Sequence, residues 1–121
     1  MEWKLTITDK KQEQHIVYLG DMENWQDPSI PVDDFLPGKK AEAVFFKRML
    51  QELHIPMNFT QAKVVAEDGF SQEVELSDLE AAFLVFKHQG ELLTRGFPAR
   101  LYVPTAADCF NVKSVVHIHL D

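Results

Sequence analysis

The stretch from residue 96 to residue 121 constrains the fold more than any other part of this sequence. Pro98 fixes its own φ and disfavours a helix at the residue before it, so residues 99–103 enter an extended conformation. Pro104 lacks a backbone N–H and ends the predicted strand. The fold must therefore include a β-sheet that accepts this segment.

A second strand is predicted at residues 113–120, where side-chain character alternates with the period of two expected of a strand. The two predicted faces carry Val116, Ile118 and Leu120 on one side and Val115, His117 and His119 on the other. The loop before this strand holds Cys109, the only cysteine, so the chain cannot form an internal disulfide.

The rest of the chain alternates between short apolar runs and turn residues. Further strands are predicted at residues 3–8, 14–19, 62–66, 70–76 and 82–86. The first two are separated by a short polar turn, which predicts an opening hairpin.

One main helix is predicted at residues 40–54, because apolar residues recur there at helical spacing, at Ala43, Phe46, Leu50 and Leu53. Residues 77–80 have the Ser-x-x-Glu form of a capping box and predict a short helical turn. Residues 20–39 show no periodicity and predict a long loop. These elements predict an α+β fold with a mixed, largely antiparallel sheet, built as one domain over residues 1–121.

The net charge of -7 works against nucleic acid or an anionic membrane as a partner. The first residues lack the apolar run of a signal peptide, and no stretch of eighteen apolar residues occurs. We therefore expect a cytoplasmic protein.

The C-terminal stretch also carries a motif. Residues 96–104 read Gly-Phe-Pro-Ala-Arg-Leu-Tyr-Val-Pro, and Val-Lys-Ser-Val follows after a loop. In order and spacing these residues resemble the end of the molybdopterin-binding oxidoreductase domain of the sulfite oxidase family. Asp68-Gly69-Phe70 and the Gly-Glu-Leu-Leu of residues 90–93 extend the match upstream, so that it covers about the second half of the chain. The resemblance implies a mixed α+β domain whose strands and loops surround a pterin pocket.

The resemblance also implies a cysteine thiolate that binds molybdenum from a loop after the opening strands, but residues 19–25 contain no cysteine. A thiolate is a soft ligand that other side chains do not simply replace. Arg100 and Lys113 match cationic positions of the motif and could meet the pterin phosphate, or they could form salt bridges instead.

The loop between these two cations departs from the family, because Asp108, Phe110 and Asn111 stand where a Gly and a basic residue are common. Asp108 would repel an anionic cofactor, whereas Asn111 is a further candidate for binding it. Cys109 is a candidate for the missing thiolate, with a small buried hydrophobe as the alternative.

His117 and His119 lie two residues apart on one strand and could reach a common metal ion. A third ligand would have to come from His15 or from an Asp of the 20–39 loop. The alternative is the polar, solvent-facing side of an edge strand.

Three functions follow from the sequence. The first is a domain that resembles the molybdopterin-binding family, lacks the metal, and binds a pterin-like or other small anionic ligand near Arg100, Lys113 and Asn111. The second is an interaction module that uses the same fold without a cofactor and packs on a partner or forms a homo-oligomer. The third is an active oxidoreductase in which Cys109 binds molybdenum.

Overall fold

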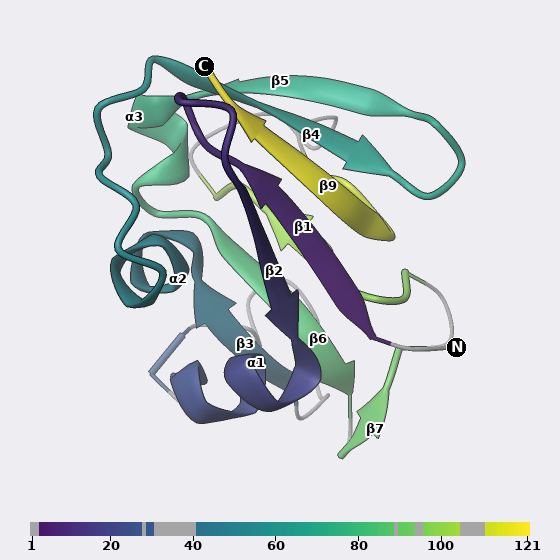
Figure 1. Ribbon diagram of the computed structural model, residues 1–121. Helices are drawn as coiled ribbons and strands as arrows, with labels where there is room; N and C mark the ends of the chain where they lie inside the picture. The colour runs from purple at the N-terminus through teal and green to yellow at the C-terminus, as the bar shows by residue number, and fades with distance from the viewer. Residues whose placement is uncertain (1–2, 28, 31–40, 89, 94–95, 105–110) are drawn as a thin grey trace.

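The computed structural model describes residues 3–27, 29–30, 41–88, 90–93, 96–104 and 111–121. Within them, five strands form one sheet in the order β2 (Gln14–Tyr18), β1 (Lys4–Thr8), β9 (Val115–Leu120), β4 (Gln61–Ala66) and β5 (Ser71–Glu75). β1 and β9 run parallel, and the other neighbours are antiparallel. The opening hairpin is therefore confirmed, and the C-terminal strand lies at the centre of this sheet (Figure 1).

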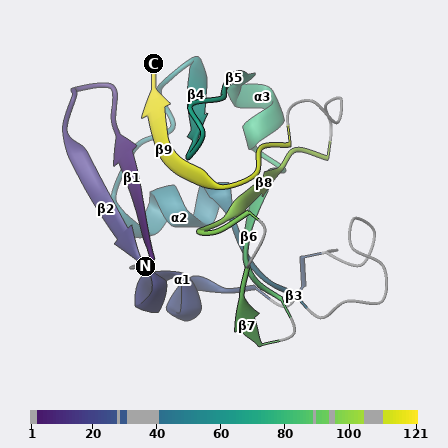
Figure 2. The same ribbon diagram turned by 90° about the vertical axis from the view of Figure 1, so that its right-hand side faces the viewer.

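A second, antiparallel sheet is organised around β6 (Phe83–His88). β6 pairs with β3 (Ala41–Phe45), β7 (Glu91–Leu92) and β8 (Arg100–Tyr102). The two sheets are seen separately in Figure 2. The α+β fold with mixed, largely antiparallel sheets that the sequence predicts is confirmed.

Three short helices connect the described strands: α1 (Leu19–Trp25), α2 (Phe46–Glu52) and α3 (Leu76–Leu79). α2 contributes Phe46, Met49 and Leu50 to the main core, where they pack with side chains of both sheets. None of the helices in the described part of the chain is long and apolar enough to cross a membrane.

The predicted helix at residues 40–54 is wrong in its first part, because residues 41–45 form β3. Ala43 and Val44 are both buried but belong to different apolar clusters, one on each side of the second sheet. A strand that is buried on both faces has consecutive apolar residues. A short apolar run of this kind also occurs in buried helices, so the sequence alone does not distinguish the two.

The predicted loop at residues 20–39 is also wrong at its start, where α1 forms. Met22 is buried, and Leu19 and Trp25 pack against the same core at a spacing of three residues. The Asp21 carboxylate accepts the Tyr18 backbone N–H at 3.0 Å and caps the helix. Residues 31–40 of the predicted loop lie outside the described part of the chain.

Two local predictions need smaller corrections. The helical turn predicted at residues 77–80 is present as α3, but Glu75 precedes it as N-cap and no side chain caps it.

In β9, an irregularity in the pairing with β4 shifts the alternation of buried and exposed residues. Val115 is therefore buried with Ile118 and Leu120, whereas Val116 is half-buried. A β-bulge of this kind reverses the phase of every residue before it.

Leu101 ties β8 to the segment that leads into β9, because its backbone N–H and C=O bond to Val112 at 2.8 and 3.1 Å, and its side chain is fully buried. We expect Leu101→Ala to lower the free energy of unfolding by about 3 kcal/mol, through lost apolar contact and a residual cavity. Leu92→Ala, at a 37% exposed position of the same sheet, is the matched control and should cost less than about 1 kcal/mol. Equal losses in urea unfolding would contradict this account of the core.

Candidate functional site

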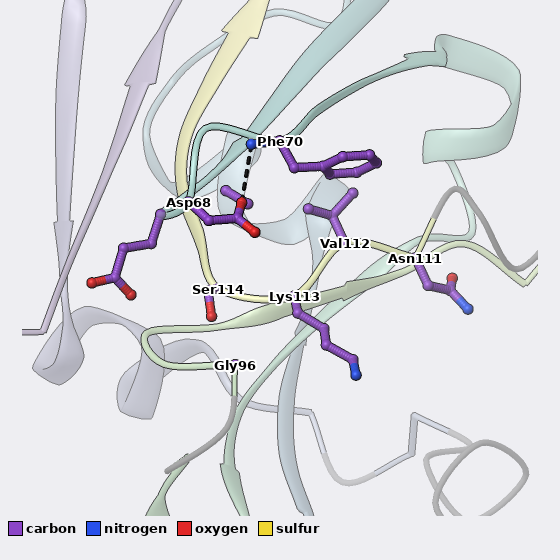
Figure 3. Close-up of a pocket in the computed structure, with 9 residues that line it drawn as sticks. Asp68, Phe70, Gly96, Asn111, Val112, Lys113 and Ser114 are labelled. Carbon is purple, nitrogen blue, oxygen red and sulfur yellow. Dashed lines mark hydrogen bonds between the residues drawn. The ribbon is translucent and has the colours of Figure 1, made fainter.

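A pocket of about 670 Å³ opens where the turn between β4 and β5 faces the segment that leads into β9 (Figure 3). The turn supplies Glu67, Asp68 and Phe70, and the segment supplies Asn111, Val112, Lys113 and Ser114. Two predicted cofactor-binding residues, Asn111 and Lys113, thus line one pocket. The residues of the turn were not predicted as a site, although Asp68 and Phe70 belong to the stretch that resembles the family.

Backbone hydrogen bonds fix both walls of this pocket. The Asp68 carboxylate accepts the Phe70 backbone N–H at 3.0 Å, which closes the turn. The Glu67 N–H donates to the carbonyl of Ser114 at 2.9 Å and ties the turn to the opposite segment. Asn111 accepts the Val103 N–H through Oδ1 at 2.8 Å, so its side-chain N–H₂ group is the part left for a ligand.

Arg100, the third predicted cofactor-binding residue, is held beside the pocket and is not among its lining residues. Its guanidinium carbon lies 5.4 Å from the centre of the Tyr102 ring, within the range of a cation–π contact. Its aliphatic part packs on Gly96, where an added Cβ would come within 2.5 Å of the Arg100 Cγ. Gly96 also has φ +90, so it is required both by its conformation and by this contact.

The charges of the described lining do not match those of a strongly anionic cofactor. Glu67 and Asp68 provide two carboxylates against the single ammonium group of Lys113. Molybdenum would also need a thiolate, and residues 19–25, where the family resemblance places it, form α1 without a cysteine. Cys109 and Asp108 lie outside the described residues. The described residues of the pocket therefore do not fit the complete molybdenum cofactor.

The predicted pair of histidines is brought together on the outer face of the first sheet. The rings of His117 and His119 stack with centroids 3.9 Å apart and planes 9° from parallel. Thr8 Oγ1 lies 2.7 Å from His117 Nε2, at hydrogen-bonding distance. Burial, and then the neighbouring His119, lower the pKa of His117.

His15 does not join this pair, which corrects its predicted role as third ligand. His15 lies opposite Ile7, and His117 lies opposite Thr6, the neighbour of Ile7 in β1. Because successive residues of a strand point to opposite faces, His15 and His117 lie on different sides of the sheet. A metal ion on the His117–His119 pair stays a prediction, without His15 as its third ligand. The alternative ligand, an Asp of the 20–39 loop, is not tested for Asp33 and Asp34, which lie outside the described residues.

Comparison with solved structures shows a similar fold. The crystal structure of the sulfane dehydrogenase SoxCD from Paracoccus pantotrophus matches with a TM-score of 0.70 over 98% of this chain, at 16% sequence identity. The chain spans 38% of the length of that protein chain. The sequence matches no protein-family model and none of the curated proteins. The comparison thus establishes a sulfite-oxidase-like α+β fold. At 16% identity it does not assign a function to this chain.

The lowered pKa of His117 links stability to pH. In the unfolded chain the His117 imidazole is protonated once the pH falls below its ordinary pKa of about 6.5. In the folded chain the same imidazole is protonated only at a lower pH, so protonation stabilises the unfolded state. The free energy of unfolding should therefore fall as the pH drops from 7 to 5, and it should fall less in His117→Gln, which keeps a hydrogen-bonding partner for Thr8. Urea unfolding at several pH values measures this. An identical pH dependence in the two proteins would contradict the assignment.

Proposed function

We propose that this protein is a sulfite-oxidase-like domain that binds a small pterin-like ligand with a single anionic group, without a molybdenum centre. The observation that carries the proposal is the placement of Asn111 and Lys113 in one pocket of about 670 Å³, at the end of the motif that resembles the family. The fold similarity to a sulfane dehydrogenase over nearly the whole chain supports it.

The lining offers complementary contacts for such a ligand. Lys113 can pair with a phosphate or carboxylate, and the Asn111 amide can donate a hydrogen bond beside it. The Phe70 ring is 50% exposed at the pocket, where it can contact a planar heterocycle. A volume of about 670 Å³ is in the range of small-molecule sites.

The two carboxylates define the rest of the ligand. Carboxylates accept hydrogen bonds and repel further negative charge, so Glu67 and Asp68 favour a heterocycle edge that carries N–H donors. A pterin has such an edge. A ligand with several phosphates would meet repulsion from both side chains, because among the described lining residues Lys113 alone carries a positive charge.

Substitution of Lys113 tests the proposal directly. A fluorescent pterin with a phosphomonoester side chain should bind saturably to the wild-type protein, and Lys113→Ala should weaken binding by about tenfold or more through loss of a charge-assisted hydrogen bond. Lys47→Ala, on the exposed side of α2, is the control and should leave the affinity unchanged. Fluorescence anisotropy measures both. No saturable binding by the wild type, or equal effects of the two variants, would overturn the proposal.

A second candidate function is self-association through β2, which pairs only with β1 among the described strands and forms an edge of its sheet. Ile16 and Tyr18 are 40% and 46% exposed on this edge strand. The strand contains no Lys, Arg, Asp or Glu. The opposite edge strand, β5, exposes Glu73 and Glu75, which discourage pairing. A second copy of the chain is therefore better accommodated at β2 than at β5.

Light scattering after size exclusion distinguishes this candidate from a monomeric binding domain. The candidate predicts a dimer that Ile16→Lys converts to a monomer, because a charge on an edge strand opposes pairing. Lys63→Glu changes a charge in β4, a strand of the same sheet that is paired on both edges, and should leave the dimer intact. A monomeric wild-type protein at high concentration would exclude self-association through β2.

A further inference from the structure

A separate cluster of possible metal ligands lies at the turn between β1 and β2. One ligand atom each from Asp9, Glu13 and His15 can be chosen so that all three lie within 4.8 Å of one another. None of these residues lines the pocket discussed above. The cluster combines two carboxylates with an imidazole, a donor set that suits divalent transition-metal ions.

The turn holds these residues in place through its backbone. The Asp9 N–H donates to the Glu13 carbonyl at 2.9 Å, and the Gln12 N–H donates to the Asp9 carbonyl at 2.9 Å. Asp9 Oδ1 accepts the N–H groups of Lys11 and Glu13 at 2.9 and 3.0 Å. The second oxygen, Oδ2, is thereby directed toward His15 Nε2, 2.9 Å away.

This spacing matches that of two ligands on one ion. At metal–ligand distances of about 2.1 Å, adjacent ligands are about 3 Å apart on an octahedral ion and about 3.4 Å apart on a tetrahedral one. Asp9 Oδ2 and His15 Nε2 have this separation as hydrogen-bond partners, and an ion that binds both atoms would take the place of the proton between them; their side chains are only 13% and 24% exposed. The exposed side chain of Glu13 can complete the set with little rearrangement.

A cavity of about 380 Å³ adjoins the cluster and gives the ion an open side. It is lined by all three ligands and by His54, from the segment after α2, which is not part of the cluster itself. Lys10 also lines it, but its Nζ is directed to the Asn58 carbonyl, 3.4 Å away, and not to the Asp9 carboxylate. Water or a small ligand can therefore reach the coordination positions that the protein leaves open.

We propose that Asp9, Glu13 and His15 form a binding site for a divalent transition-metal ion such as Zn²⁺ or Co²⁺. Two carboxylates balance the charge of the ion, and the neutral imidazole favours a transition metal over Mg²⁺ or Ca²⁺. The site is distinct from the His117–His119 pair, which lies on the other face of the sheet.

Titration of the tag-free, metal-stripped protein with Co²⁺ and Zn²⁺ tests the site, with visible absorption and calorimetry as readouts. One equivalent should bind at this cluster, and His15→Gln and Glu13→Gln should each weaken its binding at least about tenfold. The double variant His117→Gln/His119→Gln removes the other candidate pair and should keep this equivalent at the wild-type affinity. Glu13 is exposed, so Glu13→Gln should leave the fold intact.

Three outcomes would overturn the proposal. The first is that the wild-type protein takes up no Co²⁺ or Zn²⁺. The second is that the His15 and Glu13 variants bind as tightly as the wild type. The third is that the His117/His119 double variant loses the ion. Circular dichroism of each variant separates loss of ligand from loss of fold.

Discussion

The pairing of β9 on both of its edges is the interaction on which the rest of this structure depends. β9 pairs in parallel with β1, from the start of the chain, and antiparallel with β4, from its middle. The Val115 N–H also donates to the Ala99 carbonyl at 2.8 Å, which joins β9 to the segment before β8. Because β9 is fixed on both edges, the residues that precede it are held against the β4–β5 turn. The candidate pocket is a consequence of this arrangement.

The sequence predicted those elements whose local pattern agrees with their final environment. The opening hairpin, β4, β5 and β9 each alternate or end at clear turn residues, so propensity and packing favour the same structure. The helix prediction was wrong for residues 41–45, because the burial of Ala43 and Val44 on opposite faces of a strand depends on contacts with β6. The bulge that buries Val115 depends likewise on β4, far along the chain, and no pattern within β9 indicates it.

The candidate site was predicted in part. Asn111 and Lys113 were found through the motif, since both belong to one short segment that the motif covers. The contribution of Glu67 and Phe70 required the pairing of β4 with β9, which a single sequence does not reveal. The same holds for His15, whose grouping with Asp9 and Glu13 follows from the register of the β1–β2 hairpin and separates it from His117.

We propose that the fold and the molybdenum chemistry are separate in this chain. The fold is similar to that of a sulfane dehydrogenase, while the region that the family resemblance assigns to the metal thiolate forms α1, which contains no cysteine. The molybdenum content of tag-free protein, produced in cells that make the cofactor and measured by mass spectrometry, tests this separation most directly. We predict far less than one molybdenum atom per chain. About one atom per chain, lost in Cys109→Ser, would contradict it and support an active oxidoreductase.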